Sequence, residues 1–173
     1  MKLLAVDDAR ARMLACVSAL PAETVAIADS VGRVLAEDVT AARDQPPFHA
    51  SAMDGWAVRA ADAPGGLRVL GESAAGHAYD GAVGAGEAVR IFTGAPMPAG
   101  CDAVVIQENA TRDGETVTVP AVAAGHHVRP AGGDFRAGEA LLAKGARIDP
   151  WRLSLAAAAG RAELSVARRP RVA

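Results

Sequence analysis

Three short segments of this 173-residue chain carry side chains suited to chemistry on an anion. Asp54 stands among small residues just before an alternating apolar run, so the sequence places one carboxylate at the mouth of a β-strand. Thr93 and Gly94 follow another apolar run and combine a hydroxyl with a residue that lets the backbone approach a ligand. Arg129 opens a third, loop-like segment. Together these residue types could bind a phosphate or a similar oxyanion.

Each segment also has a purely structural interpretation. Asp54 and Gly55 could form a simple turn in which the carboxylate accepts from local N–H groups. Residues 93–96 could be a strand end followed by a turn that prolines stiffen. Residues 129–134 could be a hinge between two domains rather than a loop that closes over an anion. Ser51 could donate to a phosphate or serve only as a turn residue, and Asp102 is expected to be structural.

The elements that would position these residues differ along the chain. The N-terminal part predicts a helix that starts near Asp7 and ends at Pro21, with Met13, Leu14, Val17 and Leu20 on one face. A strand is expected over 23–28, a short helix from Asp29 or Ser30 through Leu35, and a strand over 38–42. Near the C-terminus, Asp149 and Pro150 predict the start of a helix over 151–159 that stops at Gly160, followed by a strand over 163–166.

The middle of the chain has a different texture, with glycine or proline every few residues between short apolar runs. We expect strands at 55–59, 67–71, 87–92, 103–107 and 116–119. Asp113-Gly114 lies between the last two runs and predicts a hairpin with a tight turn. The fold class is therefore α+β. A mixed α/β domain formed by residues 1–46 and 143–173 would hold an inserted domain, residues 47–142, of short, curled sheets.

Composition narrows the possible functions. Hydrophobic residues make up 51% of the chain and aromatics only 3%, which predicts a sizeable core built from Val, Leu, Ile and Ala. A formal charge of −2 gives no overall attraction to nucleic acid or to an anionic membrane. Two cysteines do not indicate a disulfide framework. We expect a cytoplasmic protein, because neither a signal peptide nor a membrane span is evident.

Four stretches of the sequence resemble one family in the right order. They are SVGRVLAEDV from Ser30, PFHASAMDGWAVRAAD from Pro47, IFTGAPMPAGCDAVVIQE from Ile91, and VRPAGGDFRAGEALL from Val128. The family is that of the molybdopterin molybdenumtransferases, whose animal relative is the C-terminal domain of gephyrin. The resemblance covers nearly the whole chain and implies the N-terminal two domains of a longer enzyme. We expect the nucleotide-type third domain and the small fourth domain of the family to lie outside this sequence.

The resemblance implies a function in molybdenum cofactor biosynthesis. Such enzymes insert molybdate into adenylylated molybdopterin and release AMP, and Mg²⁺ would be held by a carboxylate and phosphate oxygens. It assigns Asp54 and Thr93 as catalytic residues, with Asp54 as the Mg²⁺ ligand. Ser51, Gly55, Gly94 and Arg129 would bind substrate. The chain alone is expected to be inactive, and the alternative is a structural, dimerising module without a catalytic role.

The resemblance also implies partners. The longer protein would form a homodimer and receive its substrate from an adenylylating enzyme of the same pathway, with no nucleic acid and no membrane involved. Three residues depart from the family pattern: His49 stands where an Asp is common, Trp56 where a Tyr is common, and Gly133 where a Glu is usual. The departures leave Ser51, Asp54 and Gly55 intact.

Overall fold

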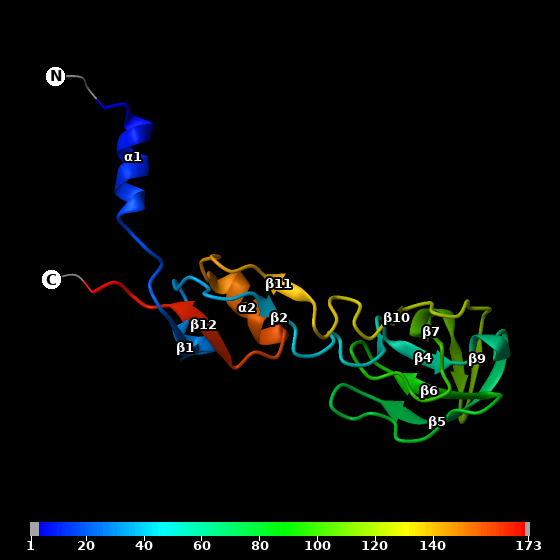
Figure 1. The fold of residues 1–173 in the computed structure, drawn as a ribbon. Helices are drawn as coiled ribbons and strands as arrows, with labels where there is room; N and C mark the ends of the chain where they lie inside the picture. The colour runs from blue at the N-terminus through cyan, green and yellow to red at the C-terminus, as the bar shows by residue number, and fades with distance from the viewer. Residues whose placement is uncertain (1–3, 172–173) are drawn as a thin grey trace. The chain divides into compact units, whose positions relative to one another are not determined.

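The structure, a computed structural model, describes residues 4–171 and is mostly sheet with two α-helices (Figure 1). It divides into two compact units, one formed by residues 1–42 with 138–173 and the other by residues 43–137. The second unit is thus inserted into the first, with borders at 42/43 and 137/138 where the sequence predicted 46/47 and 142/143. Within residues 4–171, no helix has the length and apolar character needed to span a membrane.

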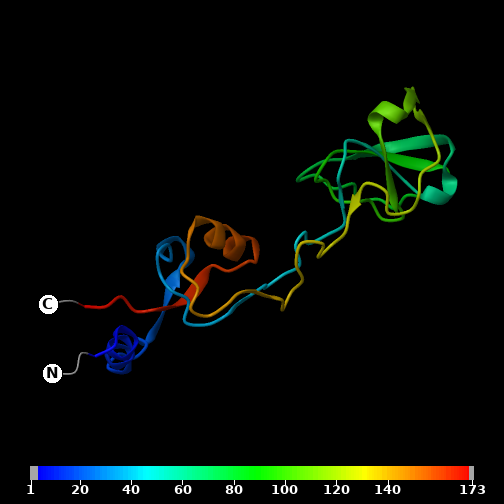
Figure 2. The same ribbon diagram turned by 90° about the horizontal axis from the view of Figure 1, so that it is seen from above.

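The first unit contains two antiparallel strand pairs and helix α2. Strand β1 (Ala22–Ala26) pairs with β12 (Glu163–Ala167), and the two lie side by side in both views (Figures 1 and 2). Strand β2 (Val39–Thr40) pairs with β11 (Ala140–Leu142). A shared core packs α2 on these strands, with Leu35, Val39, Ile148, Ala156, Leu164 and Val166 as its buried members.

Helix α2 (Pro150–Ala158) forms where the sequence predicted it. The Asp149 side chain accepts from the main-chain N–H of Arg152, so it caps the helix, and Pro150 occupies the first turn. Gly160 has a φ of +80°, which is the left-handed conformation that ends many helices. The two predicted strands of this unit that pair with each other, β1 and β12, are confirmed as well.

Of the two helices predicted in the N-terminal part, the first is confirmed at its start but not at its end, and the second was wrong. Helix α1 (Val6–Ala15) ends well before Pro21, so Val17 and Leu20 lie beyond it, and none of its residues is buried. An apolar face needs a packing partner to extend a helix, and α1 has none among the described residues. No α-helix runs from Asp29 or Ser30 to Leu35. A single 3₁₀ turn, η1 (Ile27–Asp29), stands there, and the buried Ser30 hydroxyl donates to the Ile27 carbonyl at 2.7 Å.

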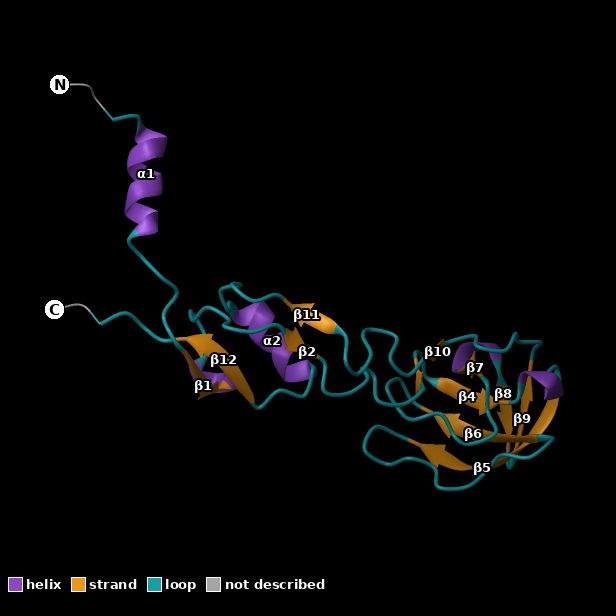
Figure 3. Ribbon diagram, viewed as in Figure 1, coloured by secondary structure: helices purple, strands orange, loops and turns teal. Residues whose placement is uncertain are grey.

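The second unit is built on a curled six-stranded sheet (Figure 3). The order across the sheet is β7 (Ala103–Ile106), β4 (Gly55–Val58), β6 (Glu87–Ile91), β5 (Gly65–Ser73), β9 (Thr116–Val119) and β8 (Thr111–Asp113). Of the adjacent strand pairs in this sheet, β5 and β6 are parallel and the others are antiparallel. A separate pair joins β3 (Ala50–Ser51) to β10 (Val128–Arg129). Two further 3₁₀ turns, η2 (Ala60–Asp62) and η3 (Gln107–Asn109), complete the described part of the unit.

All five predicted strands of the second unit are confirmed. The predicted hairpin between residues 103–107 and 116–119 is wrong, because 116–119 pairs with a different strand. The Asp113-Gly114 turn joins β9 to β8, whereas β7 pairs with β4. Strand β8 is exposed at all three residues and polar in sequence, so it carried no alternating apolar signal.

Strand β4 is buried along its whole length because apolar residues cover both faces of the sheet there. Trp56 and Val58 belong to the core on one face, and Ala57 belongs to a smaller cluster on the other. This rigid central strand begins directly after Asp54, and its start therefore fixes where that carboxylate lies.

Candidate functional site

The structure brings Asp54 and Thr93 together. Strands β4 and β6 are antiparallel, with Gly55 opposite Ile91, so the start of β4 lies beside the end of β6. Asp54 precedes β4 and Thr93 follows β6. Both the main-chain N–H and the hydroxyl of Thr93 donate to Oδ1 of Asp54, each at 2.8 Å. Two motifs far apart in sequence thus form one hydrogen-bonded pair.

The pair keeps the carboxylate ionised. The main-chain N–H of Thr93 and then its hydroxyl hold the pKa of Asp54 below the ordinary 3.8, and the charge of Arg90 acts in the same direction. Both donors use Oδ1, and no residue within 4–171 donates a hydrogen bond to Oδ2. The site therefore presents one free, charged oxygen.

This oxygen fits a hard cation such as Mg²⁺ as a single ligand. Among the described residues no group of three His, Cys, Asp or Glu side chains could hold a metal. Mg²⁺ is commonly bound by one or two carboxylates with substrate phosphates and water as its other ligands. Asp54 matches that kind of site, in which the substrate supplies most of the coordination.

The loop that precedes Asp54 is stabilised by hydrogen bonds between its own residues. The Ser51 hydroxyl donates to the Met53 carbonyl at 2.5 Å and accepts from the Met53 N–H at 3.3 Å, and the residue is 2% exposed. In the structure this hydroxyl sets the shape of the loop, and its expected contact with substrate stays a prediction. The Gly94 N–H donates to the Ser51 carbonyl at 2.8 Å, so the first two motifs are joined here as well.

The two glycines of the site differ in what they require. A Cβ on Gly55 would lie 2.0 Å from the carbonyl oxygen of Val105 on β7, so only glycine lets the strands approach this closely. Gly94 has a φ of +83° and open space around it. It turns the chain after Thr93 and leaves the face above it uncovered.

Arg129 lies on β10, which pairs with β3 so that Arg129 stands opposite Ala50 and Val128 opposite Ser51. The third motif therefore lies against the loop that leads to Asp54. The guanidinium binds both oxygens of Asp134, at 2.7 and 2.5 Å, and both side chains are exposed. The Arg129–Asp134 loop is thus closed on itself within the second unit.

The residues that depart from the family pattern have structural partners. The N–H of Ala131 donates to Nδ1 of His49 at 3.3 Å, and Trp56 is buried in the core with Arg90 and Arg112 over its ring. A Cβ at Gly133 would lie 3.0 Å from the Pro130 carbonyl oxygen, so the tight turn there favours glycine.

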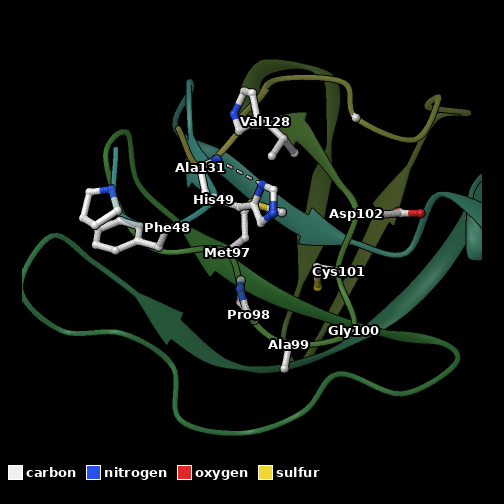
Figure 4. Close-up of a pocket in the computed structure, with 13 residues that line it drawn as sticks. Phe48, His49, Met97, Pro98, Ala99, Gly100, Cys101, Asp102, Val128 and Ala131 are labelled. Atoms are coloured by element: carbon white, nitrogen blue, oxygen red, sulfur yellow. Dashed lines mark hydrogen bonds between the residues drawn. The ribbon is translucent and has the colours of Figure 1, made fainter. Parts of the chain in front are cut away.

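A hollow of about 840 Å³ lies on another part of the second unit (Figure 4). Its walls are mostly apolar, and Phe48, His49, Met97, Cys101 and Val128 are among them; Asp54 and Thr93 are not. Burial raises the pKa of the Cys101 thiol to about 12, with Asp102 acting in the same direction, and this disfavours the nucleophilic thiolate. Asp102 itself accepts from the Ala60 N–H at 2.7 Å, which is the structural role expected of it.

Sequence reasoning missed Arg90 and Gln107. Arg90 lies on β6 opposite Trp56, and its guanidinium donates to the Gly55 carbonyl oxygen at 3.0 Å and to the side chain of Gln107. The sequence feature that could have indicated Arg90 is an arginine within an apolar strand run, three residues before Thr93. Its meaning depends on strand pairing, which the local sequence does not reveal.

Comparison with known proteins adds independent findings. A family profile described as "MoeA N-terminal region (domain I and II)" matches residues 4–160. A relative from Staphylococcus aureus (strain Mu50), named molybdopterin molybdenumtransferase, is 36% identical over 97% of this chain and 42% of its own length. A relative of the same name from Haemophilus influenzae is 35% identical over 98% of this chain and 43% of its own.

Solved structures agree. The crystal structure of the molybdopterin biosynthesis moea protein from Pyrococcus horikosii superimposes with a TM-score of 0.87 at 32% identity, over 98% of this chain and 45% of that one. A second structure, from Pyrococcus horikoshii OT3, gives 0.79 at 36% identity over 84% and 41%. The chain thus spans less than half the length of the proteins that it matches.

Proposed function

The chain belongs to the molybdopterin molybdenumtransferase family, to whose N-terminal region it corresponds, and from this premise we propose that it supplies part of a site for molybdenum cofactor biosynthesis. The reaction would be insertion of molybdate into adenylylated molybdopterin with release of AMP. The observation that carries the proposal is the Asp54–Thr93 pair, which presents a free carboxylate oxygen beside an uncovered loop.

Each residue of the pair has a distinct task in this proposal. Asp54 stays ionised, and its Oδ2, to which no described residue donates, would hold Mg²⁺ against the phosphates of the substrate. Thr93 fixes the carboxylate by using both of its donors on Oδ1. When bound, Mg²⁺ supplies positive charge for the phosphoric anhydride that is broken. Arg129 binds Asp134 through Nη2 alone, and its other guanidinium N–H groups would be the donors for an anionic substrate.

We further propose that the chain has no appreciable turnover by itself. It spans 42% of the S. aureus relative, and one free carboxylate oxygen binds neither a nucleotide nor molybdate tightly. The substrate would be delivered by an adenylylating enzyme, and the complete protein would be a homodimer.

The test is AMP release from adenylylated molybdopterin with Mg²⁺ and molybdate. The chain alone is compared with a chimera in which it replaces the matching N-terminal region of the S. aureus relative. We expect molybdate-dependent AMP release from the chimera and none from the chain. Release by the chain alone at the rate of the complete relative would refute the shared site, and a folded but inactive chimera would argue against the family activity.

One observation favours the alternative of a structural, dimerising module. Helix α1 exposes Val6, Met13 and Leu14 at 83%, 66% and 59%, and apolar side chains gathered on an exposed surface are typical of an interaction site. Light scattering of the chain and of its Met13→Ser/Leu14→Ser variant tests this role. A dimer that the double variant abolishes supports the module, and a monomer in both cases counts against it.

A further inference from the structure

We propose that Arg90 is a positioning residue for Asp54: its guanidinium ties the start of β4 to η3, so that the Asp54 carboxylate stays in place against Thr93. The consequence for catalysis rests on the proposed function, but the positioning itself concerns only this chain. Arg90 touches neither the free Asp54 oxygen nor, in this proposal, the reacting atoms.

The first step of the argument is the bridge that Arg90 makes. Its Nη1 donates to the carbonyl oxygen of Gly55, the first residue of β4, at 3.0 Å. Its Nη2 donates to the side-chain oxygen of Gln107, the first residue of η3. A planar guanidinium can hold two acceptors in fixed directions at once, which a lysine ammonium on a flexible stem does less well.

The second step is that both bridged residues hold the main chain of Asp54. Gly55 follows Asp54 directly, and the N–H of Gln107 donates to the Asp54 carbonyl oxygen at 3.0 Å. Thr93 holds the side chain of the same residue. Asp54 is therefore fixed at its main chain through the partners of Arg90 and at its carboxylate through Thr93.

The third step is that Arg90 has little freedom itself. Its guanidinium carbon lies 5.4 Å from the centre of the Trp56 ring and 4.8 Å from the centre of the Phe92 ring. Trp56 is buried in the core of the second unit, so the guanidinium rests against a rigid surface. The position of Asp54 is thereby coupled to the core.

Amide spectra of the ¹⁵N-labelled chain test the proposal without substrate or metal. The N–H of Thr93 donates to a charged carboxylate, so its proton should resonate at low field and exchange slowly. In Arg90→Lys we expect this signal to move upfield and its exchange to quicken by about tenfold or more. The matched control is Arg68→Lys, on the same sheet, whose partner Glu87 is remote from Asp54 in the chain; its Thr93 signal should stay in place.

An unchanged Thr93 signal in a folded Arg90→Lys chain would overturn the proposal. If that variant unfolds the second unit, Gln107→Leu replaces it, because it removes one Arg90 partner while keeping the main-chain N–H that binds Asp54. Loss of the low-field Thr93 signal in Gln107→Leu supports the proposal, and an unchanged signal rejects it.

The activity of the chimera separates this inference from the proposed function. If the inference holds, Arg90→Lys lowers kcat more than it raises KM, because a misplaced carboxylate harms the transition state more than binding. An inactive wild-type chimera with the expected Thr93 shifts would reject only the proposed function. An active chimera would reject only the inference if Arg90→Lys changes neither the Thr93 amide signal nor kcat.

Discussion

At the residue scale, the site depends on one carboxylate oxygen that accepts two hydrogen bonds and another that accepts none within residues 4–171. The Thr93 donors both bind Oδ1 of Asp54, which holds the carboxylate in place without neutralising it. The local network thus leaves one carboxylate oxygen charged and without a hydrogen-bond donor among the described residues.

Replacing Thr93 by valine tests the network, because it removes the hydroxyl and keeps the main-chain donor. We expect the AMP-release rate of the chimera to fall by about 10- to 100-fold, the usual cost of losing a residue that orients a metal ligand. The isosteric control is Thr118→Val, in an exposed position of β9. Equal AMP-release rates for the two variants would show that the Thr93 hydroxyl has no role in the reaction.

Replacing Gly55 by alanine tests the close approach of β4 and β7. The added Cβ would lie 2.0 Å from the Val105 carbonyl oxygen, and relief requires the backbone to move. We expect the free energy of unfolding to fall by about 1–3 kcal/mol or more. Urea denaturation measures it, with Gly66→Ala as the control, since a Cβ there meets only a Thr116 methyl at 3.5 Å. Similar midpoints for both variants would contradict the packing argument.

The sequence identified some of these residues and not others for a physical reason. Asp54, Thr93 and Gly55 stand in contiguous motifs, so residue type and neighbours sufficed to single them out. Arg90 and Gln107 became relevant only through the register of β4 with β6 and β7, which is long-range information. Ser51 was assigned to substrate binding from its motif, with a turn role as the alternative, and the structure shows its hydroxyl in the local turn.

At the element scale, the predictions succeeded where local chemistry decides structure. Helix α2 has a cap, an N-terminal proline and a terminal glycine, and strands β4, β6 and β9 have clear apolar runs. Strands β5 and β7 also have apolar runs and were predicted. The elements that the sequence did not indicate are short or polar. Strands β3, β10 and β11 have two or three residues each and exist only because distant partners pair with them.

The Asp149 cap makes a prediction about pH. The N–H of Arg152, and then the Arg152 charge, hold the pKa of Asp149 below its ordinary 3.8. A carboxyl with a lowered folded-state pKa stabilises the fold above its unfolded pKa, and this stability is lost as the pH falls through the folded value. Asp149→Ala should therefore lower the urea midpoint at pH 7 and lower it much less at pH 2.

Urea titrations at the two pH values measure this difference. Asp113→Ala, which removes an exposed carboxylate of β8 that caps no helix, serves as the control. A gap between Asp149→Ala and the unchanged chain that is as large at pH 2 as at pH 7 would mean that the carboxylate does not act as a charged cap.

At the scale of the whole molecule, the Asp54–Thr93 pair lies within the second unit, which has its own hydrophobic core. The two chain segments that border this unit are hydrogen-bonded to each other. The chain enters and leaves the second unit side by side, because the N–H of Gln45 donates to the Phe135 carbonyl at 2.9 Å and that of Asp134 to the Gln45 carbonyl at 2.8 Å. We expect residues 43–137 alone to fold. Their amide spectrum should overlay on that of the whole chain away from the new ends, and a collapsed spectrum would show that the first unit is needed.

The central claim is that Asp54 belongs to the reaction centre rather than to a turn. Its most direct test is the single-turnover rate of AMP release by the chimera carrying Asp54→Asn, with Asp113→Asn as the control of equal charge change. We predict a fall of at least about 100-fold for Asp54→Asn, as expected when a group that stabilises the transition state is lost, and no change for the control. An unchanged rate in a correctly folded Asp54→Asn chimera would contradict the claim and leave the chain a structural module.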